Sequence, residues 1–389
     1  MTLAPTFILL QVVPDLDTGG AEQTTLDVAR AVVQAGGRAL VATRGGRMTD
    51  RLKADGGEVI LLPMSSKNPL VMLANALALI RIIRQCGVQV IHARSRAPAF
   101  SALWAARATG IPFIATYHGV YKARSALKRW YNAVMTRGDL VIANSDYTRD
   151  HVLAEHGLDP EHVVTIPRGV DLARFDPAKV TKARLGRLRA LWGLDATEAR
   201  PVFLLAGRLT RIKGHLTIID AVARLKARGR DVLVLFAGDD QGRSAYRQEV
   251  QTAIETAGLS QHIRRVGHCD DMPAACLLAD VALLPTLVPE SFGRAAVEPQ
   301  VMGRPVIASA HGGTTETVVD GQTGWLVAPG DADAWAQAMD HAASLGRRRL
   351  RAMGKRGSER ARRLYSNETM CAATLEVYSR LLAGGHKRR

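Results

Sequence analysis

The chain has 389 residues, which is too long for one ordinary hydrophobic core and predicts two domains of about 150 to 200 residues each. Hydrophobic residues make up 47% and charged residues 23%, without a low-complexity tract, so the composition excludes a disordered chain. The formal net charge of +16 points to polyanionic partners, which include phosphate-bearing ligands, anionic lipid surfaces and nucleic acid.

Export and membrane spanning are not expected from the sequence. No basic residue precedes the apolar stretch at the N-terminus, which argues against a secretory signal. The longest apolar run, residues 70–80, contains Asn75 and ends at Arg81, short of the roughly 20 residues that a spanning helix needs. The scattered cysteines, without zinc or redox spacing, predict reduced thiols in a cytoplasmic protein: Cys86, Cys269, Cys276 and Cys371.

Short apolar runs typical of buried parallel strands alternate with helical patterns. In the first half we predict strands over 7–13, 39–42, 88–92, 113–116 and 140–143, and a helix over 20–34. In the second half we predict strands over 202–206, 232–237, 281–285 and 306–308, and a helix over 217–228. This alternation favours parallel sheets with helices on both faces.

The alternation breaks between residues 171 and 200, a charged stretch in which we expect the domain linker. We therefore predict an N-terminal domain over 1–185 and a C-terminal domain over 196–366. The predicted fold class is α/β, with two Rossmann-like, doubly wound domains facing each other across a cleft. Ligands of such sheets bind beyond the carboxyl ends of the strands, so a shared site is expected in that cleft.

Gly19 and Gly20 lie between a predicted strand and a predicted helix. Paired glycines there let backbone amides approach an anion at the helix N-terminus, although a tight turn without a ligand is the alternative. The segment lacks the GxGxxG order of dinucleotide dehydrogenases, which argues against a nicotinamide site.

Arg208 and Lys213 lie in the segment 207–214, which follows the first strand of the second domain. Two cations at a strand end can neutralise a diphosphate, while surface charge is the alternative interpretation. The segment does not have the GxxxxGK[ST] order of a P-loop, which argues against nucleotide hydrolysis.

The segment 289–299 follows another predicted strand and carries two glutamates, Glu290 in a loop and Glu298 on the helix behind it. Carboxylates accept hydrogen bonds from sugar hydroxyls, and the amides of Phe292 and Gly293 lie near the helix start, where they can meet phosphate or sugar oxygens. The spacing alone is weak evidence; together with the strand–loop–helix context it favours a sugar-nucleotide site.

With these motifs, and with Gly312-Gly313-Thr314-Thr315-Glu316, the chain resembles glycosyltransferase family 4 over nearly its whole length. The family consists of retaining enzymes with the two-domain GT-B fold, and the chain most resembles its bacterial lipopolysaccharide-core and cell-envelope branch. The resemblance implies that a C-terminal helix, over 367–385, packs back on the first domain.

The resemblance also implies roles for the matched residues. Gly19 and Gly20 would approach the donor diphosphate, which Arg208 and Lys213 would bind and stabilise as it leaves. Glu290 would contact the transferred sugar.

Further matched residues complete the implied donor site. Glu298 would bind the ribose, His118 would lie beside the donor sugar, and the nucleotide base would rest on the backbone of Val266, Gly267 and His268. Arg294 stands where many members carry an aliphatic residue, which leaves the donor open. The sequence shows no metal cluster, so we expect no metal and no cofactor, only a UDP- or GDP-sugar as substrate.

The acceptor is argued from charge. Residues 59–138 contain no Asp or Glu but eleven basic residues, and within them 121–131 mixes bases with aromatic residues in a helical pattern. Such a helix can bind an anionic bilayer or a phosphorylated lipid-linked sugar, although a solvated helix with a core tryptophan is the alternative. The residues assigned to this acceptor and membrane surface are Lys122, Arg124, Lys128, Arg129 and Trp130.

The predicted enzyme is thus a hexosyltransferase that moves mannose or glucose from a nucleotide-diphosphate sugar to a lipid-linked or lipopolysaccharide-core glycan, at the cytoplasmic face of the inner membrane. A GT-B-type epimerase or phosphorylase is one alternative. A basic nucleic-acid-binding protein is another, although no recognised reader motif supports it and we expect no nucleic-acid partner.

Overall fold

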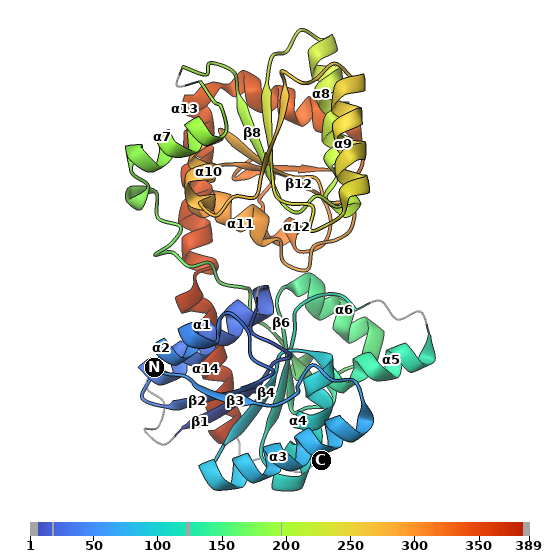
Figure 1. The fold of residues 1–389 in the computed structure, drawn as a ribbon, viewed down its shortest axis with the longest axis vertical. Helices are drawn as coiled ribbons and strands as arrows, with labels where there is room; N and C mark the ends of the chain where they lie inside the picture. The colour runs from blue at the N-terminus through green and yellow to red at the C-terminus, as the bar shows by residue number, and fades with distance from the viewer. Residues whose placement is uncertain (1–6, 18, 122–124, 196, 384–389) are drawn as a thin grey trace. The chain divides into compact units, whose positions relative to one another are not determined.

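The computed structural model describes residues 7–17, 19–121, 125–195 and 197–383 (Figure 1). The chain divides into two compact units, the first built from Met1–Gly169 with Asn367–Arg389 and the second from Val170–Ser366. Each unit has a parallel sheet of its own, so the prediction of two Rossmann-like α/β domains is confirmed.

The first unit contains a seven-stranded parallel sheet in the order β3-β2-β1-β4-β5-β6-β7. Its strands are β1 (Ile8–Val12), β2 (Arg38–Thr43), β3 (Glu58–Leu61), β4 (Val90–Ala93), β5 (Phe113–Tyr117), β6 (Leu140–Ala143) and β7 (Val163–Thr165). Its helices are α1 (Gly20–Gln34), α2 (Thr49–Ala54), α3 (Pro69–Cys86), α4 (Arg96–Thr109), α5 (Ala126–Asn132), α6 (Asp146–His156) and α14 (Asn367–Ala383), with 3-10 turns at Ala133–Thr136 and Pro160–His162.

Both faces of this sheet are covered, which explains why its central strands are mostly apolar. Successive side chains of a strand point to opposite faces. Leu9 therefore packs in one core with Leu26 of α1 and Tyr378 of α14, whereas Leu10 packs in another core with helices α3 and α4. The C-terminal helix thus packs on the first unit, as predicted.

The second unit contains a six-stranded parallel sheet in the order β10-β9-β8-β11-β12-β13. Its strands are β8 (Val202–Ala206), β9 (Leu233–Ala237), β10 (Ile263–Gly267), β11 (Val281–Leu284), β12 (Val306–Ser309) and β13 (Gly324–Val327). Its helices are α7 (Lys182–Leu191), α8 (His215–Ala227), α9 (Ser244–Thr256), α10 (Met272–Leu278), α11 (Arg294–Val301), α12 (Thr314–Thr317) and α13 (Ala332–Leu364), with 3-10 turns at Pro177–Lys179 and Arg211–Lys213.

The predicted boundary at residue 185 is wrong, because the first unit ends at Gly169 and the expected linker belongs to the second unit. Apolar side chains of this stretch, Phe175 and Trp192 among them, are buried in the core of the second unit. The stretch is therefore anchored to the second unit by a few buried apolar side chains, although most of its residues are charged and exposed.

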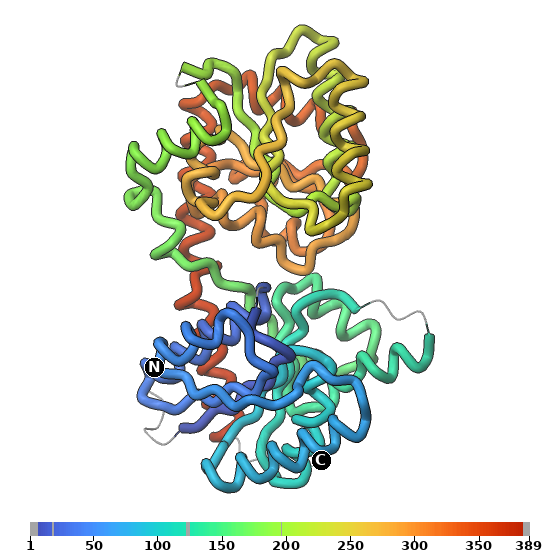
Figure 2. Tube along the Cα trace, viewed as in Figure 1, coloured from blue at the N-terminus to red at the C-terminus, as the bar shows by residue number. Residues whose placement is uncertain are grey.

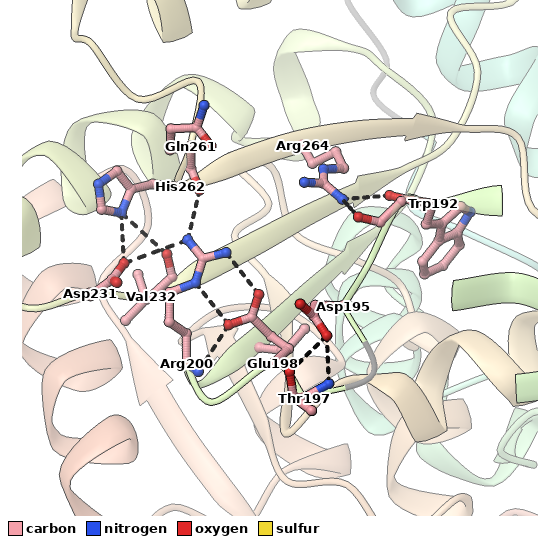
Figure 3. Close-up of polar contacts among 12 residues, drawn as sticks. Trp192, Asp195, Thr197, Glu198, Arg200, Asp231, Val232, Gln261, His262 and Arg264 are labelled. Carbon is pink, nitrogen blue, oxygen red and sulfur yellow. Dashed lines mark hydrogen bonds and ion pairs between the residues drawn. The ribbon is translucent and has the colours of Figure 1, made fainter. Parts of the chain in front are cut away.

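Polar contacts hold the end of the same stretch against the second sheet (Figure 3). Arg264 of β10 donates a hydrogen bond to the carbonyl of Trp192 at 2.6 Å. Just before β8, Arg200 donates to the Glu198 carboxylate at 2.8 Å and to the carbonyl of Gln261 at 2.8 Å. In the Cα trace of Figure 2, this stretch is drawn in green as part of the second unit.

Candidate functional site

In the second unit, the loops that follow the neighbouring strands β8 and β11 bring two predicted residues together. Lys213 Nζ donates to Glu290 Oε1 at 2.5 Å, and both side chains are mostly buried. The backbone N–H of Leu287 donates to the carbonyl of Ile212 at 2.9 Å, which holds the two loops side by side. Residues 77 positions apart thus form an ion pair at the carboxyl edge of the sheet.

Glycines allow these loops to lie so close. Gly214 has a φ of +72°, and a Cβ there would lie 1.8 Å from the carbonyl oxygen of Pro285. The Lys213 stem passes near Gly207, where a Cβ would lie 3.6 Å from Cδ of the lysine. These contacts fix the direction from which the ammonium group reaches Glu290.

The segment 312–316 supports the glutamate loop from behind. Gly313 N–H donates to the carbonyl of Glu290 at 2.7 Å, and a Cβ on Gly313 would lie 2.6 Å from Cα of Phe292. A Cβ on Gly312 would lie 2.5 Å from the carbonyl oxygen of Glu290. The Gly-Gly pair is therefore required for packing against the loop.

Glu298, the second predicted glutamate, lies on α11 and is bound by Arg294 of the same helix. The distance from Arg294 Nη2 to Glu298 Oε1 is 2.6 Å, in the i,i+4 arrangement that is common on helices. A ribose bound by this carboxylate would share it with the guanidinium group.

The Phe292 side chain is buried against Tyr365, with ring centroids 5.3 Å apart, so this residue can offer only its backbone to a ligand. Gly293 caps the N-terminus of α11 with a φ of +85°. The predicted use of these two backbone amides stays a prediction.

The remaining donor-site residues of the second unit lie at strand ends. Arg208 is exposed and donates to Gln241 Oε1 at 3.3 Å, so it is not drawn into the Lys213–Glu290 pair. Gly267 ends β10, and its carbonyl accepts from Gly238 N–H at 2.7 Å.

The other two residues predicted to hold the base differ in exposure. Val266 packs partly buried against the core, whereas the ring of His268 is exposed and contacts Asp270 at 2.9 Å.

In the first unit, Gly19 and Gly20 begin α1, as predicted, and charged side chains lie against both. A Cβ on Gly19 would lie 2.2 Å from Glu22 Oε2. A Cβ on Gly20 would lie 2.0 Å from Arg168 Nη1. The two glycines thus allow a close approach, but the groups that approach them here are the Glu22 carboxylate and the Arg168 guanidinium group.

His118 directly follows β5 and contacts the same arginine. Arg168 Nη2 lies 2.9 Å from His118 Nδ1, and the amide of Asn144 donates to the His118 carbonyl at 3.3 Å. Burial, reinforced by the positive charges of Arg168 and Arg94, holds the pKa of His118 well below its usual value. The ring is therefore neutral at physiological pH.

A buried polar network lies beside His118. Arg94 Nε donates to the side-chain carbonyl of Gln11 at 2.9 Å and Nη1 donates to the Thr116 hydroxyl at 3.2 Å. The ring of His92 joins the same hydroxyl, at 2.7 Å, to the phenol of Tyr378, at 2.6 Å. Since Tyr378 belongs to α14, the C-terminal helix helps to order this edge of the first sheet.

Sequence reasoning missed Arg168, Arg94 and His215. Arg168 follows β7, a three-residue strand that the apolar pattern did not reveal, and only its position in a Pro-Arg-Gly strand end could have signalled it. His215 is buried under the Lys213 loop, edge-on to Phe236 with ring centroids 5.1 Å apart, and burial lowers its pKa to about 4.

The predicted acceptor surface is described in part, because Lys122 and Arg124 lie outside the described residues. Lys128, Arg129 and Trp130 lie exposed on α5. Trp130 is 52% exposed and its ring lies 5.4 Å from that of Phe100 on α4, so it is only partly a core residue. Arg129 has an acidic neighbour, Glu155, at 3.5 Å.

Comparisons with known proteins identify the family. A family model described as Glycosyltransferase Family 4 matches residues 18–174, and one described as Glycosyl transferases group 1 matches residues 191–360. The solved structure of a glycosyltransferase from Rickettsia africae is 32% identical, with a TM-score of 0.90 over 97% of this chain and 99% of that one. The chain is a glycosyltransferase.

Two further comparisons bear on this glycosyltransferase. Anabaena HepE, solved in complex with UDP-glucose, shares the GT-B fold with a TM-score of 0.80 at 22% identity, over 96% of this chain and 99% of that one. A D-inositol 3-phosphate glycosyltransferase of Salinispora tropica is 30% identical over 295 residues, or 70% of this chain. The match spans only 60% of the length of that curated relative.

Proposed function

We propose that the protein transfers a hexose of the mannose or glucose class from a UDP- or GDP-sugar to a phosphorylated, lipid-linked or lipopolysaccharide-core glycan. The observation that carries this proposal is the Lys213–Glu290 pair at the carboxyl edge of the second sheet. An ammonium group and a carboxylate next to each other suit a sugar diphosphate, because one end of that ligand is anionic and the other carries hydroxyl groups.

The proposed chemistry follows from this pairing. Glycosyl transfer passes through an oxocarbenium-like state while negative charge grows on the leaving diphosphate. Lys213 would stabilise that charge, and Glu290 would hold the sugar hydroxyls. Arg208 is exposed and would supply a second cation. The departing phosphate would take the proton of the acceptor hydroxyl.

A thermal-shift panel of UDP-, GDP- and ADP-sugars tests the donor, because a ligand that binds the folded chain raises its melting temperature. We expect one nucleotide class to raise it. Incubation with the donor alone separates the alternatives: isomerised donor would indicate an epimerase, and transfer to free phosphate would indicate a phosphorylase. DNA binding without sugar-nucleotide binding would favour a nucleic-acid-binding protein.

We further propose that the protein works at the inner face of the plasma membrane, docked through the acid-free stretch 59–138. Among the residues that the structure describes, seven of the thirteen exposed large hydrophobic side chains lie in this stretch: Leu61, Leu70, Leu73, Leu77, Trp104, Leu127 and Trp130. Exposed apolar groups among basic residues suit an anionic bilayer, because hydrocarbon and charge then both contribute to binding.

Helix α3 is the centre of this surface. Leu70, Leu73 and Leu77 are 77%, 51% and 61% exposed, and Arg81 and Arg84 continue the same helix face. The opposite face is buried against α4. Contrary to the sequence-based expectation, α3 is long and apolar enough to cross a bilayer by length and composition, with a mean hydropathy of 1.4. Its buried face favours lying on the surface instead.

Vesicle co-sedimentation tests the docking. The double substitution Leu73→Ser with Leu77→Ser is expected to reduce binding to anionic vesicles at least fivefold. Leu191→Ser, at a leucine of the second unit that is 76% exposed, is expected to change nothing. Equal binding of the wild type to anionic and neutral vesicles at low salt would contradict the proposal. In that case a soluble phosphorylated acceptor is the better candidate.

A further inference from the structure

The hydrogen bond between Arg168 and His118 determines which ring nitrogen of His118 carries its proton. Arg168 Nη2 lies 2.9 Å from Nδ1, and a guanidinium nitrogen can only donate. Nδ1 must therefore accept this hydrogen bond with its lone pair, and it cannot carry a proton. The single proton of the neutral ring is then on Nε2.

The arginine itself is held by the fold. It follows β7 and is succeeded by Gly169, at which a Cβ would lie 2.5 Å from Cα of Asn367, the first residue of α14. Gly169 N–H also contacts Met370 Sδ at 3.3 Å. On its other side, the guanidinium group of Arg168 lies directly over Gly20. These contacts restrict the position and orientation of the guanidinium group.

Charged and titratable groups from the neighbouring elements keep the His118 ring neutral. Arg94 after β4 and Arg168 after β7 both oppose a charged His118, and His92 is also buried nearby with a pKa well below its usual value. Glu22 on α1 is near Arg168, and Tyr121 contacts the His118 backbone. The two arginines therefore favour a neutral ring.

We propose that Arg168 is a positioning residue that holds His118 as the Nε2–H tautomer, so that the ring serves as a hydrogen-bond donor to the transferred sugar and not as a proton acceptor. The sugar contact rests on the proposed function; the tautomer does not. Nδ1 is occupied by Arg168 and Nε2 carries the proton, so the ring has no lone pair for the proton of an acceptor hydroxyl.

The tautomer is tested by nitrogen NMR of protein labelled with ¹⁵N-histidine, with the His118 signals assigned by their loss in His118→Gln. We expect the wild type to give the Nε2–H pattern from pH 8 down to pH 6. In Arg168→Met we expect a mixture of tautomers and titration of the ring nearer its usual pKa. Arg168→Lys, which keeps a donor, and Arg187→Met, at an exposed arginine of α7, serve as controls.

Kinetics test the sugar contact. Arg168→Met is expected to lower kcat at least tenfold with little change in the KM of the donor. His118→Gln, whose amide replaces the Nε2–H donor, should lose less turnover than His118→Asn. Thermal melting of each variant identifies any that fail to fold, and Arg168→Ala, which also removes the donor, then replaces Arg168→Met.

The outcomes separate this proposal from the proposed function. An Nδ1–H or charged ring in the wild type would overturn the tautomer, whatever the enzyme transfers. The Nε2–H pattern without turnover of any nucleotide sugar would leave the tautomer standing and contradict the transferase. An Nε2–H pattern with equal losses for His118→Gln and His118→Asn would overturn the donor role.

Discussion

The carboxyl edges of the two sheets hold their cations in different ways. In the second unit, each of the two predicted glutamates has a cation beside it, with Lys213 bound to Glu290 and Arg294 bound to Glu298. All four side chains keep some contact with solvent. A partly exposed ion pair can exchange one partner for a ligand at a modest cost in free energy, because solvent screens the charge of the side chain that loses its partner.

In the first unit the corresponding arginines, Arg94 buried and Arg168 partly buried, are hydrogen-bonded to the side chains of Gln11 and His118. Arg94 donates to the Gln11 amide, and Arg168 donates to the ring of His118. Such a network cannot exchange partners without exposing a buried polar group. Each unit taken by itself, the ion pairs of the second can give up a partner to a ligand, whereas the network of the first keeps a fixed shape.

The largest expected effect on turnover comes from replacing Lys213, the cation proposed to bind the leaving diphosphate. Lys213→Ala should lower turnover at least tenfold with the fold intact, because the leaving diphosphate loses its main counter-charge. Lys355→Ala, which removes an exposed lysine of α13, should leave turnover unchanged. Steady-state assays with matched melting curves check this prediction, and near-normal turnover in Lys213→Ala would contradict it.

The fixed shape of the first unit is tested at Gly20. Gly20→Ala places a methyl group where Arg168 Nη1 now lies, and displacing the arginine should lower turnover roughly tenfold with little loss of stability. Gly186→Ala is the control, since nothing lies within 4 Å of that position on α7, and there the helix should gain about 0.5–1 kcal/mol. A fully active Gly20→Ala enzyme would show that this contact is dispensable.

Acid stability tests the buried histidine of the second unit. His215 has a pKa of about 4 in the folded chain and an ordinary value of 6.5 when unfolded. The unfolded chain therefore binds this proton first, and stability is lost as the pH falls from 6.5 toward 4. The full loss is about 3 kcal/mol. In His215→Leu, the slope of unfolding free energy against pH should be shallower by up to one proton; an unchanged slope would contradict this.

The smallest expected effect concerns the second ion pair. Arg294→Leu frees Glu298 from an i,i+4 pair whose contribution is about 0.3–0.5 kcal/mol, so the KM of the donor should fall roughly twofold. Lys355→Leu disrupts another i,i+4 pair on α13 and should leave KM unchanged. A raised KM in Arg294→Leu would instead assign the arginine itself to the donor site.

The sequence predicted the interior of each sheet and missed its edges. The four strands that were not predicted, β3, β7, β10 and β13, are the edge strands of the two sheets. An edge strand is partly exposed, so its side chains need not be uniformly apolar; β10, for example, contains Arg264 and Arg265. Central strands, buried on both faces, leave a signal that periodicity detects.

The same limit explains which site contacts were predictable. Lys213 and Glu290 follow central strands that pair with each other, so their meeting could be expected from the strand order. The contact of Arg168 with His118 could not be expected, because Arg168 follows the undetected edge strand β7. The domain boundary failed for a related reason, since Phe175 and Trp192 are single buried residues in a charged stretch.

The most direct test of the account is calorimetric titration of the wild type and Lys213→Ala with UDP, UMP, GDP and GMP. If Lys213 binds the terminal phosphate, one of the two diphosphates should bind the wild type at least tenfold more tightly than the corresponding monophosphate. This preference should disappear in Lys213→Ala. Equal binding of diphosphate and monophosphate by the wild type, or a preference that survives the substitution, would contradict the account.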